Sequence, residues 1–235
     1  MEFLITFFNA ILYQPLLKAL FFISSYLPGQ DFGIAIIILT LSIKLLLSPF
    51  SLKAIRSQIA FQQLQPKIKE IQKKYKEDIA KQSRAVLELY RKEKANPFSS
   101  FSLFLFQLPI LIALYLVFLK GLKDYPNLFF LGLIDLTRPN LFLSLLAGIF
   151  QFIQSKIFLS FFSVKNKNSL KEKSLKDKDF SQMIQEQMTY LLPIFTVFIV
   201  WKLGSIIGLY WITNTLFSIG EQWLVIKSMT KNKTT

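Results

Sequence analysis

Long apolar runs separated by basic segments are the feature that most constrains this chain. About 20 helical residues cross the roughly 30 Å hydrocarbon core of a bilayer. The chain is 52% hydrophobic and still carries a net charge of +14, and the two properties are segregated along it, as in membrane spans joined by basic loops. We therefore predict an all-α polytopic membrane protein with five transmembrane helices, near 32–54, 98–119, 140–163, 188–204 and 206–226.

The N-terminal apolar stretch, residues 3–27, is ambiguous. It is interrupted by polar residues and a proline, namely Asn9, Gln14, Pro15 and Lys18. We predict that it forms a helix lying in the membrane interface. A sixth span is the alternative, and it would move the N-terminus to the other side of the membrane.

Basic residues in the loops predict the orientation of the spans. Residues 53–94 contain twelve Lys or Arg against five Asp or Glu, and such loops stay in the cytoplasm. This rule also predicts a cytoplasmic C-terminus. The chain then divides into an interfacial helix (1–30), a first transmembrane helix (31–55), a cytoplasmic helical hairpin (56–97), transmembrane helices two to five (98–226, with a disordered cytoplasmic loop at 164–187) and a basic cytoplasmic tail (227–235).

The hairpin is predicted from apolar residues at helical spacing in two arms, with charged residues on the other faces. Lys76-Glu-Asp78 is the expected turn. The charges fit either a solvated hairpin or a docking surface for anionic lipid, ribosomal RNA or a partner protein. The sequence does not choose between these two interpretations.

Lys44 lies within the apolar run of the first span. A charge near the middle of a bilayer costs at least a few kcal/mol, so it persists where a cavity or partner receives it. Thr40, Lys44, Ser48 and Ser51 fall on one face of a helix, because their spacing follows the helical period. This face is the first place to look for function.

Polar stripes recur on other spans. One stripe comprises Ser144, Gly148, Gln151 and Ser155, with Gln154 beside it; another comprises Tyr210, Asn214, Ser218 and Glu221, with Trp211 adjacent; and Gln107 lies in the second span. Single Ser or Thr residues in membrane helices usually join helices together. Several stripes together with Lys44 favour a shared hydrated cavity. We also predict an ion pair between Glu221 and Lys156.

The residue types argue against an enzyme. The chain has no cysteine and no histidine, which removes disulfides, thiolate metal sites and the commonest general base. It shows no nucleophile–base pair, metal cluster or nucleotide-binding motif. We therefore predict no catalytic residue, no metal and no cofactor.

Several motifs, in order, resemble the YidC-type membrane protein insertases and their mitochondrial and chloroplast relatives. The resemblance covers nearly the whole chain, and its most specific pieces are the Gln-x-Pro and Leu-Tyr-Trp-x-x-Asn patterns. The segments that carry it include Tyr13-Gln-Pro-Leu-Leu-Lys18, Asn96-Pro97, Gln107-Leu-Pro109, Phe152-Ile-Gln154-Ser-Lys156 and Leu209-Tyr-Trp211-Ile-Thr-Asn214.

The resemblance implies five core helices around a polar groove that receives the hydrophilic end of a nascent membrane protein. It implies a multi-pass protein of the bacterial inner or plasma membrane that works without its own nucleotide hydrolysis. The implied partners are nascent membrane proteins and the lipid bilayer, but not DNA. A Sec translocon, the signal recognition particle machinery and the ribosome are candidate partners of the 56–95 hairpin. The groove residues it implies are Lys44, Gln154 and Trp211, and the polar positions Thr40, Gln107 and Asn214 complete the predicted groove.

The chain departs from the family pattern at the basic groove position. That position is usually arginine and is Lys44 here, so the positive charge is kept but the planar hydrogen-bonding fork is lost. Two other functions remain as alternatives. One is a small anion or solute transporter that uses Lys44 as an anion site, and the other is an assembly scaffold for a translocon.

Overall fold

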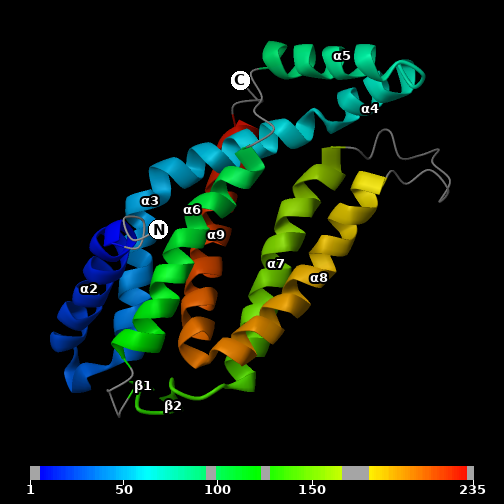
Figure 1. Ribbon diagram of the computed structural model, residues 1–235. Coiled ribbons are helices and arrows are strands. Elements are labelled where there is room, and N and C mark those ends of the chain that lie inside the picture. The colour runs from blue at the N-terminus through cyan, green and yellow to red at the C-terminus, as the bar shows by residue number, and fades with distance from the viewer. Residues whose placement is uncertain (1–5, 94–98, 123–127, 166–179, 232–235) are drawn as a thin grey trace. The chain divides into compact units, whose positions relative to one another are not determined.

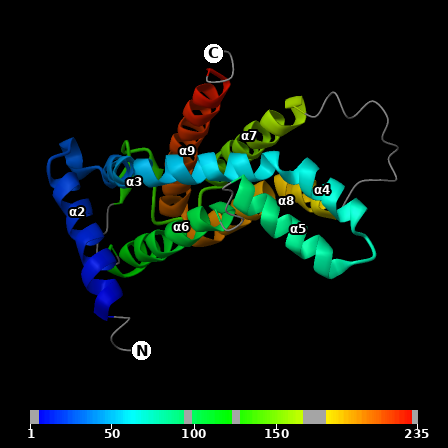
Figure 2. The same ribbon diagram turned by 90° about the horizontal axis from the view of Figure 1, so that it is seen from above.

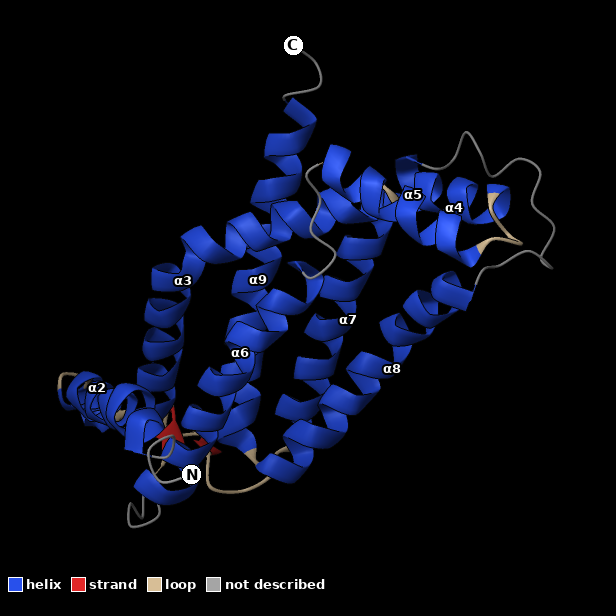
Figure 3. Cartoon of the chain, turned by 45° about the horizontal axis from the view of Figure 1, so that its top comes forward, coloured by secondary structure: helices blue, strands red, loops and turns tan. Residues whose placement is uncertain are grey.

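The fold is almost entirely helical, as predicted (Figures 1 and 3). The computed structural model describes residues 6–93, 99–122, 128–165 and 180–231. The chain forms two compact units: the first comprises Met1–Leu47 and Leu108–Gly220, and the second comprises Ser48–Gln107 and Glu221–Thr235. The helices α3 (Phe32–Gln63), α6 (Ser99–Leu116) and α9 (Ser205–Lys231) each contribute to both units.

The N-terminal helices of the first unit pack beside its core. A π-helical turn, η1 (Asn9–Tyr13), leads into α2 (Gln14–Ser25), and a short turn, η2 (Pro28–Gln30), precedes α3. Phe21 of α2 meets Phe32 of α3 edge-to-face, with ring centroids 6.0 Å apart. A Cβ atom at Gly121, in η3 (Val117–Gly121), would collide with Leu17, so glycine permits this close approach.

Helices α7 (Leu141–Lys165) and α8 (Phe180–Leu203) run side by side (Figures 1 and 2). Gly148 lies at a close approach of the two helices: a Cβ there would overlap Val197 and lie 3.2 Å from the carbonyl oxygen of Pro193. Gly204 joins α8 to α9 with a φ of +101°, a conformation that favours glycine. This tight turn lies at the predicted boundary between the last two apolar segments.

A short β-hairpin connects η3 to α7. Strand β1 (Phe129–Phe130) pairs antiparallel with β2 (Ile134–Asp135). The Asp31 carboxylate links this hairpin to the start of α3, because it accepts hydrogen bonds from the backbone N–H of Ile34 at 2.9 Å and of Leu131 at 2.6 Å. Leu131 has a φ of +53°, and the second bond holds that uncommon backbone conformation.

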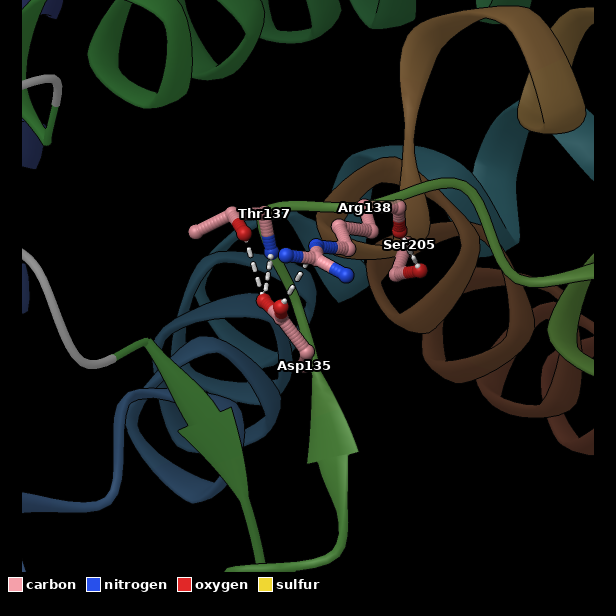
Figure 4. A network of polar contacts seen from close by, with 4 residues as sticks. All are labelled: Asp135, Thr137, Arg138 and Ser205. Carbon is pink, nitrogen blue, oxygen red and sulfur yellow. Dashed lines mark hydrogen bonds and ion pairs between the residues drawn. The ribbon is translucent and has the colours of Figure 1, made fainter.

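Asp135 organises the segment between β2 and α7 (Figure 4). Its carboxylate accepts hydrogen bonds from the Oγ1 of Thr137 at 2.5 Å and from the backbone N–H of Thr137 at 2.9 Å, and it lies 3.3 Å from Nε of Arg138. These hydrogen bonds, with the Arg138 charge, hold the pKa of Asp135 below its ordinary value. The hydroxyl of Ser205 donates to the carbonyl oxygen of Arg138, so the network ties the approach to α7 to the start of α9.

The second unit contains a helical hairpin formed by α4 (Gln65–Lys74) and α5 (Ile79–Lys92), which pack against each other (Figure 2). Pro66 lies in the first turn of α4, where a proline is tolerated because that N–H has no partner within the helix. The side chain of Gln82 donates to the carbonyl oxygen of Gln72 at 3.1 Å. The turn occupies residues 75–78, and the Asp78 carboxylate caps α5.

Acidification should loosen this hairpin. Lys67 lies 2.5 Å from the carboxylate of Glu93, and its hydrogen bond and charge hold the pKa of Glu93 below the ordinary 4.5. A lowered pKa means that the contribution to stability is complete above pH 4.5 and is lost as the pH falls through the lowered value. Nitroxide labels at exposed positions 73 and 84 should therefore report a broader distance distribution only below that pH.

The matched control for this titration is Lys67→Met, which removes the ion pair and should broaden the distribution near neutral pH. Both groups are exposed, so the effect should be small and should shrink further in high salt. A distribution that stayed the same, or narrowed, on acidification of the unmutated chain would contradict this account of the hairpin.

Some predicted boundaries differ from the structure. Helix α8 begins at Phe180, within the segment 164–187 that was predicted to be disordered, and α9 extends to Lys231, within the predicted tail. The 180–187 segment is rich in Gln, Met and Glu, which are good helix formers, so polarity alone was a poor guide to helix ends. Residues 166–179 of that loop lie outside the described part of the chain.

The length and composition of the helices indicate which of them could span a membrane. Among the described residues, two helical segments are long and apolar enough to cross a bilayer, Thr6–Ser25 and Phe32–Lys74. Three shorter apolar helices occupy Gln107–Gly121, Leu141–Ile157 and Thr189–Leu203. The count of five spans stays a prediction. Because Thr6–Ser25 meets the criterion, the sixth-span alternative also stays open beside the interfacial interpretation.

Candidate functional site

Lys44 reaches across from α3 to α9 within the first unit. Its Nζ donates a hydrogen bond to the hydroxyl oxygen of Ser218 at 2.9 Å. Both side chains are half-buried. The hydroxyl of Ser218 in turn donates to the backbone carbonyl of Asn214, one turn earlier on α9, at 2.9 Å. The ammonium group of Lys44 is therefore received by a neutral oxygen whose own hydrogen is already engaged.

Asn214 contributes a second polar group to the same stretch of α9. Its side-chain Oδ1 is buried and has no hydrogen-bond partner among the described residues. A buried carbonyl oxygen without a partner costs free energy, and such a group is a ready acceptor for a donor that enters the site. Asn214 and Ser218 are four residues apart, so they lie on one face of the helix.

Trp211 joins this stripe to α7. Its indole Nε1 donates to the side-chain oxygen of Gln151 at 3.1 Å. The amide nitrogen of Gln151 then donates to the side-chain oxygen of Gln154 at 3.4 Å, one turn further along α7. Trp211, Gln151 and Gln154 are all half-buried. The structure thus brings Gln154 and Trp211, both predicted site residues, into one hydrogen-bonded chain through Gln151.

The other two predicted site residues are Thr40 and Gln107. Thr40 is only 2% exposed, and its hydroxyl donates to the carbonyl of Ile36 on its own helix at 2.7 Å. This is the bond by which a threonine satisfies itself inside a helix. Gln107 is half-buried and belongs to the second unit.

The predicted ion pair between Glu221 and Lys156 is replaced by other partners. Glu221 is 4% exposed and accepts a hydrogen bond from the hydroxyl of Ser51 within the second unit. Lys156 lies 3.3 Å from the hydroxyl of Tyr190, with its Nζ 5.4 Å from the ring centroid of Phe152. The ammonium of Lys156 is thus held by aromatic rings of α7 and α8, which stabilise a cation at their faces.

Helix α9 is the common element of the candidate site. Its residues Trp211, Asn214 and Ser218 are spaced at three and four residues, so one face of α9 meets Gln151 of α7 and Lys44 of α3. The predicted site omitted Ser218 and Gln151. Both belong to the polar stripes that the sequence shows on the two helices. The sequence therefore showed these two residues, but not which side chains they contact. The arrangement offers one positive charge and several neutral hydrogen-bonding groups.

Comparison of the sequence with known proteins finds relatives of this chain. Residues 22–233 match the family described as "60Kd inner membrane protein". The membrane protein insertase YidC of Clostridium tetani is 34% identical over 208 residues, which are 88% of this chain and 87% of that protein. Proteins of the same name from Francisella tularensis subsp. novicida and subsp. holarctica are 32% identical over 199 residues. That match covers 84% of this chain but only 33% of the Francisella proteins.

Proposed function

Because this chain belongs to the 60Kd inner membrane protein family, we infer that it is a membrane protein insertase, as its relatives are named. It inserts nascent membrane proteins into the bilayer and assists their folding. The observation that carries the mechanism is the contact between Lys44 and Ser218. That contact places a positive charge among neutral polar groups within apolar helices, where a hydrophilic segment of a substrate could be received.

The proposed fold has five membrane spans that surround a hydrophilic groove. Helix α9 contributes Trp211 and Asn214 to its wall, α7 contributes Gln151 and Gln154, and α3 contributes Lys44, which Ser218 of α9 holds from behind the wall. Thr40 supports the wall through packing, since its hydroxyl is bonded within α3. Gln107 of α6 belongs to the proposed lining on the family resemblance alone. The C-terminus and the hairpin of α4 and α5 lie on the cytoplasmic side, in agreement with their basic residues.

Insertion needs no nucleotide hydrolysis by this chain in the proposed mechanism. A polar segment in hydrocarbon carries unsatisfied groups that cost several kcal/mol each, and the amide and hydroxyl groups of the site lower that cost. Lys44 attracts acidic side chains of the segment. Burial of the substrate's own apolar span releases about 25 cal/mol per Å² of apolar surface, and this release drives the process. The chain itself performs no enzymatic reaction.

The hairpin formed by α4 and α5 is the proposed meeting point for soluble partners. Its α5 face presents Lys81, Arg84, Arg91 and Lys92, and such cationic helices bind anionic partners. We place the Sec translocon, the signal recognition particle machinery and the ribosome among the candidates for this surface. The comparisons favour the insertase over the anion transporter and the translocon scaffold, because the relatives are named as insertases.

Reconstitution in liposomes tests the proposed function. The acidic probe is a single-span protein whose translocated N-terminal tail carries two aspartates, and the neutral probe has asparagines in their place. Liposomes that contain this protein should protect the tails of both probes from added protease, whereas empty liposomes should protect them far less. Equal protection with and without the protein would contradict the insertase function.

A further inference from the structure

We propose that Ser218 is a positioning residue for Lys44, which fixes the ammonium group on the face of α9 where a substrate's acidic groups are received. This inference rests on the proposed insertase function. It assigns to Ser218 a role in the choice of substrate, beyond that of a small residue that lets helices approach. The hydrogen bond that carries it is the 2.9 Å contact between Nζ of Lys44 and Oγ of Ser218.

The direction of the hydrogen bonds supports this role. A serine hydroxyl has one hydrogen and two acceptor lone pairs, and the hydrogen of Ser218 points to the carbonyl of Asn214 at 2.9 Å. The hydroxyl oxygen can therefore only accept from Lys44. Bonding to its own helix fixes the Ser218 rotamer, so the acceptor is held in place before the ammonium reaches it.

The Ser218 hydroxyl that accepts from Lys44 carries no charge. A carboxylate at position 218 would hold Lys44 equally well but would cancel its charge. A hydroxyl takes one of the three ammonium donors and leaves the net positive charge unchanged. Ser218 thus holds the cation in place while preserving its attraction for the carboxylates of an entering segment.

The same geometry gives a reason for lysine at this position. An ammonium group is a compact point charge, and a single hydroxyl oxygen matches one of its donors. A guanidinium is a planar fork with five donors, which suits a bidentate partner. Lysine also has a long flexible stem that draws its charge toward the nearest water. A fixed acceptor on α9 opposes that movement and keeps the charge within the stripe.

A double-mutant cycle tests the proposal with the acidic and neutral probes. Ser218→Ala should slow insertion of the acidic probe by about fivefold, in the range expected for the net loss of one typical hydrogen bond. It should change insertion of the neutral probe by less than about twofold. In a Lys44→Ala background, Ser218→Ala should have no further effect on the acidic probe. Ser218→Thr, which retains the hydroxyl, should restore the rate.

Ser228→Ala is the matched control, because the Ser228 hydroxyl also bonds to a carbonyl of α9, that of Val225 at 2.8 Å. It should leave both probes unaffected. If Ser218→Ala slowed both probes equally, or slowed the acidic probe further in the Lys44→Ala background, Ser218 would be a packing residue and the proposal would be wrong. Failure of the unmutated protein to insert either probe would instead overturn the proposed function.

Discussion

Lys44→Ala should slow insertion of the acidic probe by about tenfold or more. The charge-assisted hydrogen bonds that the ammonium can offer an entering carboxylate are worth about 1.5–3 kcal/mol each, and 1.4 kcal/mol corresponds to a tenfold change in rate. The neutral probe gains nothing from the charge, so its rate should change far less. Protease protection in liposomes, followed over time for both probes, measures the two rates.

Lys44→Arg and Ser42→Ala are the controls for this substitution. Arginine keeps the charge, so Lys44→Arg should retain most of the rate, although it lacks the single-donor match to Ser218. Ser42 lies two residues before Lys44 on α3, is exposed, and bonds only to the carbonyl of Ile38 among its described contacts. Normal insertion of the acidic probe by Lys44→Ala would rule out charge attraction as the mechanism.

The sequence predicts the Lys44 face because a charge in an apolar run is rare and its neighbours follow the helical period. It also shows the stripe on α9. It cannot predict which residue of that stripe meets Lys44, since this depends on the axial offset between α3 and α9, which packing of the whole unit sets. For that reason the sequence alone could not show that Ser218 accepts a hydrogen bond from Lys44.

Thr40 is a residue that the sequence pattern placed in the site but whose hydroxyl bonds within its own helix. Its spacing places it on the Lys44 face, but a threonine hydroxyl can satisfy itself by bonding to its own helix. The structure shows this bond to Ile36 and nearly complete burial. Residue type and periodicity locate a side chain on a helix, whereas the competition between local and interhelical hydrogen bonds decides what it contacts.

Gly148 shows how the candidate site depends on the close packing of α7 against α8, which the pattern of polar residues does not reveal. Its position on α7 lies one turn before Gln151, and α8 approaches it with only the space of a glycine between them. Any side chain at 148 must push α8 away or displace Val197. Because packed interiors leave few voids, such overpacking costs typically about 1–3 kcal/mol. The contact between Gln151 and Trp211 depends on this placement of α7.

Gly148→Leu should therefore lower the free energy of unfolding by about 2–3 kcal/mol, measured by denaturant titration in detergent micelles.

Gly220→Leu is the matched control, because nothing lies within 4 Å of a Cβ at Gly220 on α9. That variant should be neutral or slightly stabilising, since leucine favours a helix over glycine by roughly 0.8 kcal/mol. Gly148→Ala should cost less than Gly148→Leu, and adding Val197→Ala should recover part of that smaller loss, because it removes the Cγ2 atom that would lie nearest to the new Cβ. Equal stabilities for Gly148→Leu and Gly220→Leu would show that α7 and α8 are not packed closely at this point, and the position of Gln151 would then need another explanation.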